Sequence, residues 1–397
     1  MAAAISEVEN QVQNQLKSVG VVGGGQLAWM MADGAKALGL ELLVQTPNAD
    51  DPACAIAHRT FIGGVADAVV TAKMAQYCDV ITFENEFIDL PALRQLTDSD
   101  RLFYPQLDCL APLLDKYDQR QYCDSIGLPS PRFATLQSKA DLPFIEALVG
   151  DIGLPLVLKT RRHGYDGQGT FILHNLAQIT QTWQKLGYQP VLLEAFVEFE
   201  KELAVMVARS FSGEVAVYPV VETQQVDQVC RRVIAPAQVP PSVVDQVEAI
   251  ATQLVNRLGV VGILGIELFV TKSQQVLINE IAPRTHNSGH YTLDACNTSQ
   301  FEQQLRAVSG LSLGSTDWKV AGTGAVMVNL LGTETRVSDY AEKRAALAQI
   351  PNAFVYWYGK RQARLGRKMG HVTVLTDAIQ ESTAVEAIIQ TVEQRWY

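Results

Sequence analysis

Short apolar segments alternate with helix-like patterns in the N-terminal part of the chain. SVGVV at 18–22 is typical of a buried strand, and QLAWMMADGAKALGL has the apolar spacing of a helix after a turn of three glycines. A second unit contains LELLVQTP, and a third ends in the strand DVITFENE. Such alternation predicts a parallel sheet with helices on its faces. We expect this α/β domain to cover residues 18–115, after a polar extension at 1–17.

The pattern changes to α+β after residue 115. A helix is expected to end at Gly127, where two prolines follow and mark an extended exit. The strand LPLVLKT, the loop RRHGYDGQGT, a helix near 176–187 and the strand VLLEAFV then predict a compact unit. Further strands, a helix at about 242–258 and the hairpin GILGIELFV–TKSQQ–VLINEIA come next. After about 310, short β runs and a last amphipathic helix predict a small β-rich C-terminal domain at 311–397.

Composition narrows the classes of function. The chain has 397 residues, 48% of them hydrophobic and 19% charged, which is a globular profile that needs more than one core. The net charge of −10 argues against nucleic acid as the main partner. We see no apolar run long enough for a membrane helix and no secretory signal. The six cysteines are scattered, which favours a reducing, cytoplasmic location over a disulfide framework or zinc site.

A glycine-rich loop follows the strand that carries Lys159. The segment HGYDGQGT at 163–170 has glycines at 164, 167 and 169, which allow backbone donors to approach triphosphate oxygens. The strand-end lysine supplies a point charge for a phosphate. A surface hairpin would also use glycines, but it needs neither the lysine nor so many glycines. The other glycine turn, GGGQL at 23–27, is compatible with a phosphate site or with a simple tight turn, and the sequence leaves both open.

Two glutamates lie in the apolar strands of the predicted hairpin. If the chain turns around Ser273–Gln274, Glu267 and Glu280 face each other across the strands. Opposed carboxylates on a strand pair repel, and a divalent cation between them removes that cost. Mg²⁺ commonly takes one or two carboxylates together with phosphate oxygens. We therefore expect a magnesium site here, with Asn279 beside it.

Two basic segments complete the candidate site. APRTHNSGH at 282–290 places Arg284, His286 and His290 directly after the metal carboxylate, and an arginine there suits a carboxylate, bicarbonate or phosphate oxygen. YGKRQARLGRKMGH at 358–371 has five positive charges, beginning at Lys360. A solvated basic face would explain such a run, but the acidic background of the chain favours a local anion site.

These segments together resemble one family. GGGQL, TFENE, Lys159 with HGYDGQGT, ELFV with INEIAPRTHNSGH, and GRKMGH are similar to the 5-(carboxyamino)imidazole ribonucleotide synthetases, ATP-grasp enzymes of purine biosynthesis, over about residues 18–372. The resemblance implies an ATP-grasp fold at 116–310 with a lid at about 120–200, preceded by a pre-ATP-grasp domain. It also implies a ligase that uses ATP, Mg²⁺ and bicarbonate to carboxylate 5-aminoimidazole ribonucleotide through carboxyphosphate. A cytoplasmic homodimer with small-molecule substrates and no nucleic-acid or membrane partner is expected.

The resemblance also assigns roles by position. Arg284, His286 and Lys360 match the residues for bicarbonate and carboxyphosphate, and Glu267 and Glu280 match the Mg²⁺ ligands. The expected ATP contacts are Lys116, Lys159, Gly164, Tyr165, Asp166, Gly167, Gln168, Gly169, Thr170, Glu194, Ala195, Phe196, Val197, Glu202, Gln225, Asn279 and Glu280. The expected contacts to the ribonucleotide are Glu84, Glu86, Tyr165, Asp166, Ser288, Arg367 and Lys368.

Two positions depart from the family pattern. Gln168 stands where Lys or Arg is usual, which weakens one expected contact to the ribonucleotide phosphate. Gln225 stands where a nucleotide-contacting His is common, so we expect a changed contact. The alternatives are another ATP-grasp acyl-phosphate ligase, such as formate-dependent glycinamide ribonucleotide transformylase, and a catalytically silent nucleotide-binding relative. The loop HGYDGQG argues against the transformylase, and the retained Glu267, Glu280 and Arg284 argue against the silent relative.

Overall fold

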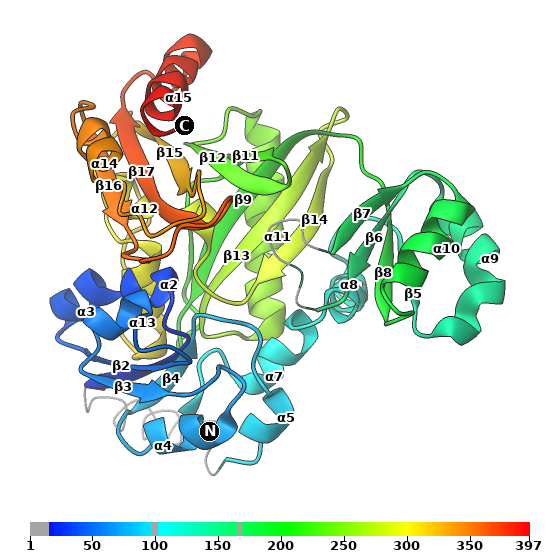
Figure 1. Cartoon of the computed structure of the whole chain (residues 1–397), viewed down its shortest axis with the longest axis horizontal. Coiled ribbons are helices and arrows are strands. Elements are labelled where there is room, and N and C mark those ends of the chain that lie inside the picture. Colours follow the sequence, from blue (N-terminus) through cyan, green and yellow to red (C-terminus); the bar gives the residue numbers. More distant parts are fainter. Residues whose placement is uncertain (1–15, 97–101, 163, 165–168) are drawn as a thin grey trace.

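The computed structural model describes residues 16–96, 102–162, 164 and 169–397. In that part of the chain, the strands form three sheets, which Figure 1 shows as separate layers. The expected residues 163 and 165–168 of the glycine loop, including Tyr165, Asp166, Gly167 and Gln168, lie outside the described residues, as does most of the polar extension. None of the described helices combines the length and the hydropathy that a membrane crossing requires.

The first sheet is parallel, with the strand order β3-β2-β1-β4, as the alternation of its sequence predicts. Its strands are β1 (Ser18–Val22), β2 (Glu41–Thr46), β3 (Arg59–Ile62) and β4 (Val80–Phe83). The expected single helix after β1 is two short ones, because the chain turns at Met30–Met31. The helices of this part are α2 (Gln26–Trp29), α3 (Ala32–Leu38), α4 (Ala68–Met74), α5 (Leu90–Leu93) and α7 (Leu107–Leu110), with 3-10 turns at Pro52–Ala55 and Ala111–Leu113.

The second sheet belongs to the small unit that projects to the right in Figure 1. It is antiparallel, with the order β5-β8-β6-β7, and it is joined to the rest of the chain through α8 (Lys116–Ser125). Its elements are β5 (Phe133–Leu136), a 3-10 turn (Lys139–Phe144), α9 (Ile145–Ile152), β6 (Leu156–Thr160), β7 (Thr170–Leu173), α10 (Leu176–Lys185) and β8 (Val191–Ala195). The buried faces of the two helices and the sheet form one core around Trp183.

The third sheet runs through the centre of the molecule in the order β14-β13-β9-β11-β12-β15-β17-β16, with β10 paired to β9. Its strands are β9 (Phe199–Arg209), β10 (Val215–Val217), β11 (Val221–Val226), β12 (Val229–Ala235), β13 (Gly262–Thr271), β14 (Val276–Ala282), β15 (Gly324–Leu331), β16 (Ala353–Trp357) and β17 (Lys368–Thr376). The C-terminal strands therefore extend the central sheet through β15, where the sequence suggested a separate unit.

Helices cover the central sheet on both sides. The longest is α11 (Pro241–Leu258), whose apolar residues at helical spacing face the sheet and which ends at Gly259 in the left-handed conformation. The others are α12 (Thr292–Ala295), α13 (Gln300–Val308), α14 (Ala341–Leu347) and α15 (Ser382–Trp396), with a 3-10 turn at Asn287–Gly289. Helix α13 contacts both β13 and α3, so it joins the central sheet to the N-terminal domain. The observed architecture confirms the predicted fold class.

Candidate active site

The two predicted metal carboxylates lie opposite each other. Glu267 on β13 pairs with Glu280 on β14, as the sequence predicts. The loop spans residues 271–275 as expected, but it is centred on Ser273 and not between Ser273 and Gln274. A bulge at Asn279 compensates for this shift, since Leu268 already pairs with Ile278. The bulge places an amide side chain beside the carboxylate pair.

Three cations surround this hairpin. The Nζ atom of Lys116, at the start of α8, lies 2.5 Å from a carboxylate oxygen of Glu280. Lys159 Nζ, near the end of β6, donates to the side chain of Asn279 at 3.0 Å and lies 2.7 Å from the Glu194 carboxylate. The third cation, Arg120, binds both the Glu194 carboxylate and the backbone carbonyl of Asn279. Two lysines expected at ATP phosphates therefore converge on the metal hairpin.

The pKa values of the two facing acids are shifted in opposite directions. Burial and the opposing Glu280 raise the pKa of Glu267. Burial also acts to raise the pKa of Glu280, but the Lys116 ammonium outweighs it and leaves that pKa below the ordinary value. Two carboxylates and a neighbouring amide oxygen are hard oxygen donors, and Mg²⁺ accepts such a set when phosphate oxygens complete its shell. The residues present thus fit the predicted magnesium site.

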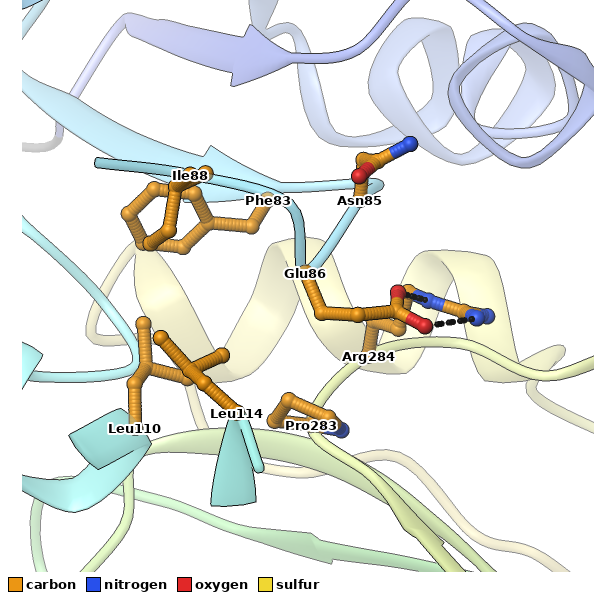
Figure 2. A pocket seen from close by; sticks show the side chains of 8 residues that line it. All are labelled: Phe83, Asn85, Glu86, Ile88, Leu110, Leu114, Pro283 and Arg284. Carbon is orange, nitrogen blue, oxygen red and sulfur yellow. Dashed lines mark hydrogen bonds and ion pairs between the residues drawn. The ribbon is translucent and has the colours of Figure 1, made fainter. Parts of the chain in front are cut away.

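Arg284 is held by Glu86 across a domain boundary. The guanidinium donates from Nε to one carboxylate oxygen at 2.6 Å and from Nη2 to the other at 3.1 Å. Figure 2 shows these two side chains pointing toward one another at one side of a small pocket, with Phe83, Ile88, Leu110 and Leu114 at the other. Despite burial, the arginine keeps the pKa of Glu86 below its ordinary value. The planar, bidentate pair fixes the orientation of Arg284.

His286 faces the metal hairpin from the segment after β14. Its Nε2 atom lies 3.5 Å from a Glu267 oxygen, and its Nδ1 atom is 2.9 Å from the hydroxyl of Ser288. Burial lowers the pKa of His286 to about 3, with further lowering from Arg284 and Lys368. The imidazole is therefore neutral at physiological pH. The backbone amide of Ser288 also points at Nδ1, so Nδ1 is an acceptor and the proton lies on Nε2.

Lys360 reaches the N-terminal domain from the loop between β16 and β17. Its Nζ atom donates to the side chain of Gln26 at 3.0 Å and to the backbone carbonyl of Lys368 at 2.9 Å. Burial, with help from the neighbouring Arg367, lowers its pKa to about 8. Arg367, in the same loop, donates to the carbonyl of Gln362 at 2.8 Å. Lys360 thus lies beside the first turn of α2, and Arg367 and Lys368 are near enough to act on its charge.

The glycine turn before α2 is occupied by a protein carboxylate. Glu84, directly after β4, accepts hydrogen bonds from the amides of Gly25 at 2.7 Å and Leu27 at 3.1 Å. A Cβ atom at Gly25 would lie 2.3 Å from a Glu84 oxygen, so the close approach requires glycine there. Of the two interpretations that the sequence left open, the structure supports a tight turn. Its free backbone donors serve Glu84, so a phosphate cradle at GGGQL is not supported.

The expected adenine and ribose residues lie where the small sheet joins the large one. Ala195 ends β8, and Phe196 and Val197 follow it. The side chain of Glu194 is buried against Arg120 and Lys159. Glu202 on β9 is hydrogen-bonded by Gln225, which lies at a bulge in β11. The departure from the family pattern at Gln225 therefore has a structural role, since its amide holds the predicted ribose carboxylate.

Sequence reasoning missed three residues of this region. Arg120 binds Glu194 and Asn279, Gln26 binds Lys360, and Gln300 binds the backbone of His286. Two signals were available in the sequence: Arg120 comes four residues after Lys116 on one helix face, and Gln26 is the polar residue of the glycine turn. No local signal identifies Gln300, because its contact depends on how α13 packs.

Comparison with known proteins agrees with this geometry. Three family models match in succession: the ribonucleotide synthetase preATP-grasp domain at 16–112, the ATP-grasp domain at 121–301, and the phosphoribosylaminoimidazole carboxylase C-terminal domain at 325–384. The N5-carboxyaminoimidazole ribonucleotide synthase of Synechococcus elongatus is 53% identical, over 100% of this chain and 97% of the relative. This chain belongs to the N5-carboxyaminoimidazole ribonucleotide synthase family. As a member, it is an ATP-dependent ligase.

Other members of the synthase family extend the comparison. The synthase of Bacillus subtilis is 38% identical over 90% of this chain and 91% of its own length. An Aspergillus clavatus synthase solved with ADP and 5-aminoimidazole ribonucleotide superposes with a TM-score of 0.86 at 29% identity, over 95% of this chain and 99% of that chain. A synthetase solved with ADP gives a TM-score of 0.86 at 32% identity, over 96% of this chain and 99% of that chain. The likeness thus covers all three domains of the synthase fold.

Proposed function

We propose that this chain carboxylates 5-aminoimidazole ribonucleotide to its N5-carboxyamino derivative, with ATP and bicarbonate as co-substrates, in de novo purine biosynthesis. The observation that supports this best is the position of His286, whose imidazole lies 3.5 Å from Glu267 of the metal hairpin. Arg284 is two residues earlier on the same segment. A group that binds bicarbonate there would lie beside the nucleotide phosphates.

The proposed reaction has two steps. A bicarbonate oxygen attacks the γ-phosphorus of ATP, the bond to the bridging oxygen of ADP breaks, and carboxyphosphate forms. The exocyclic amine of the ribonucleotide then takes up the carboxyl carbon, directly or as released CO₂. The C–N bond forms, inorganic phosphate leaves, and the amine loses a proton. Mg²⁺, held by Glu267 and Glu280, would neutralise phosphate charge in the first step.

Each group of site residues has a separate proposed role. Lys116 and Lys159 contact ATP phosphates under the loop from Gly164 to Thr170, while residues 194–197 with Glu202 and Gln225 hold the nucleoside. Arg284, His286 and Lys360 bind bicarbonate and the developing carboxyphosphate. The ribonucleotide contacts are Glu84, Glu86, Tyr165, Asp166, Ser288, Arg367 and Lys368. The buried, fixed Arg284 suits its role, because preorganised donors stabilise new charge without reorienting.

The test is ADP release with each substrate omitted in turn. We expect ATP turnover that requires bicarbonate and is stimulated by 5-aminoimidazole ribonucleotide. Turnover driven by formate and glycinamide ribonucleotide would contradict this assignment and favour the transformylase alternative. Binding of ATP without turnover under any substrate combination would favour the silent relative.

We also propose a cytoplasmic homodimer. All six cysteines are free thiols in the structure, which suits a reducing compartment. Light scattering of the purified protein measures the assembly directly, and a monomer at micromolar concentration would contradict it.

A further inference from the structure

Helix α13 carries a row of buried glutamines at its N-terminal half. Gln300, Gln303 and Gln304 are all essentially excluded from solvent. Each carboxamide uses both its oxygen and its nitrogen: Gln303 binds both backbone groups of Gly314, at 2.7 and 2.8 Å, and Gln304 joins the amide of Ile263 to the hydroxyl of Thr82. Gln303 and Gln304 therefore connect the helix to three different segments.

Gln300 makes its paired contact with the backbone of His286. Its oxygen accepts from the His286 amide at 2.9 Å, and its nitrogen donates to the His286 carbonyl at 2.7 Å. The backbone N–H of Gln300 donates to the Thr292 hydroxyl at 2.9 Å. This bond also fixes the start of α13. Both backbone groups of His286 are thus bound by one side chain.

The opposite side of His286 is also fixed. A Cβ atom at Gly265 on β13 would lie 2.5 Å from Cβ of His286, so the histidine rests directly on the strand backbone. Gln300 therefore holds His286 against β13, two residues from Glu267. With the backbone fixed on both sides, the direction of the imidazole follows from the turn at 287–289.

Helix α13 is itself part of the N-terminal core. Phe301, Leu305 and Val308 pack in one cluster with strands β1 and β2. A Cβ atom at Gly34 of α3 would lie 2.9 Å from the Cα atom of Glu302, which shows how closely the two helices approach. The Gln300 carboxamide therefore links the backbone of His286 to a helix that packs in the N-terminal core.

We propose that Gln300 is a positioning residue: it sets the place of His286 relative to the metal hairpin and to the N-terminal domain. It does not touch the reacting atoms and acts through the histidine backbone. The proposal rests on the proposed role of His286 in binding bicarbonate.

The test compares Gln300→Met with Gln303→Met in the full-length chain. Each variant loses one bond to a backbone N–H and one bond to a backbone carbonyl from the same helix, so similar decreases in unfolding midpoint are expected. Only Gln300→Met should lower kcat of bicarbonate-dependent ADP release, by about 10- to 100-fold, and raise KM for bicarbonate, because small displacements at a reacting group have effects of this order. KM for ATP should stay within about twofold in both variants.

A second measurement is independent of turnover. Hydrogen–deuterium exchange of a peptide covering residues 284–290 should accelerate in Gln300→Met and stay as in the parent protein in Gln303→Met. Equal exchange or equal kcat in the two variants would overturn the positioning role. Absence of bicarbonate-dependent turnover in the parent protein would refute the proposed function instead, and the exchange result would still decide whether Gln300 holds His286.

Discussion

Glu267 and Glu280 face each other on neighbouring antiparallel strands, and only Glu280 is paired with a lysine. We expect Glu280→Gln to lower Mg²⁺-dependent ATP turnover by roughly 10²–10³-fold, since one charged ligand of the nucleotide–metal complex is lost. The fold should persist, because the change also removes repulsion between like charges. Turnover assays over a series of Mg²⁺ concentrations measure the activity, and circular dichroism measures whether the fold persists. Glu200→Gln, at an exposed position of β9, is the control, and undiminished activity in Glu280→Gln would refute the metal assignment.

Lys360 should give the activity an alkaline limit. Burial lowers its pKa to about 8; Arg367 and Lys368 act in the same direction, and Glu84 and Asp51 act against it. If the charged form is required, turnover falls as pH rises through that value, earlier than for an ordinary lysine. Lys360→Ala should lower kcat by roughly 10²–10³-fold. In Lys360→Arg the guanidinium stays charged, so the residual activity should lose this limb of the pH–rate profile.

The buried pair of Arg120 and Glu194 predicts a strong effect on stability. Both side chains are at most 3% exposed, and Lys159 also contacts the carboxylate. Glu194→Gln leaves two buried cations without a counter-charge and should destabilise the protein by about 3–5 kcal/mol. The exposed pair of Arg94 and Asp108 is the control, since Asp108→Asn should cost less than about 1 kcal/mol. Urea unfolding measures both, and similar losses would contradict the prediction.

The same glutamate predicts how acid acts on the fold. Despite the opposing effect of burial, Arg120 and Lys159 lower the pKa of Glu194 to about 2. A carboxylate with a depressed pKa stabilises the native state fully above its ordinary pKa near 4.5, and this contribution disappears as pH falls toward 2. Unfolding free energies measured from about pH 6 down to about pH 2 should therefore fall less steeply in Glu194→Gln. Parallel curves would show that Glu194 does not titrate with folding.

In the turn between β11 and β12, Gln228 has a backbone conformation that is unfavourable for a residue with a side chain. Asp227 and Gln228 both have positive φ, at 51° and 62°, and they form the two-residue loop between the paired Val226 and Val229. Such loops favour glycine at the second position, because a side chain there costs about 1 kcal/mol. We expect Gln228→Gly to raise the unfolding free energy by about that amount. Gln228→Ala keeps a Cβ atom and should give no gain; a gain equal to that of glycine would exclude relief of backbone strain.

The sequence predicted the elements whose signal is local. The period of the N-terminal segments identified the parallel sheet, and the spacing of Glu267 and Glu280 identified the opposed acids. The pairing of Glu267 with Glu280 was predicted correctly, because the bulge at Asn279 offsets a turn that is centred on Ser273 and not between Ser273 and Gln274. Contacts between segments that are distant in the chain could not be predicted from the sequence. The pairing of Arg284 with Glu86 joins residues 198 positions apart, and nothing near either residue indicates the other.

The glycine turn at GGGQL, for which the sequence left a phosphate site and a tight turn open, shows a second limit. Glycines in a βα turn are compatible with a bound phosphate and with a bound carboxylate, since both accept from backbone amides. The order of the parallel strands brings Glu84 beside the turn, because β1 and β4 are neighbours. That adjacency depends on the topology of the sheet and leaves no trace in the spacing of the glycines.

The unbroken ladder from β14 to β16 has a consequence for protein engineering. Strand β12 pairs on one side with β15 from Ala325 to Val328, so removing the residues after 310 would expose that row of backbone donors and acceptors along Arg232 to Ala235. An uncovered edge of this kind recruits strands from other molecules. A chain shortened to its first two domains should therefore aggregate on expression.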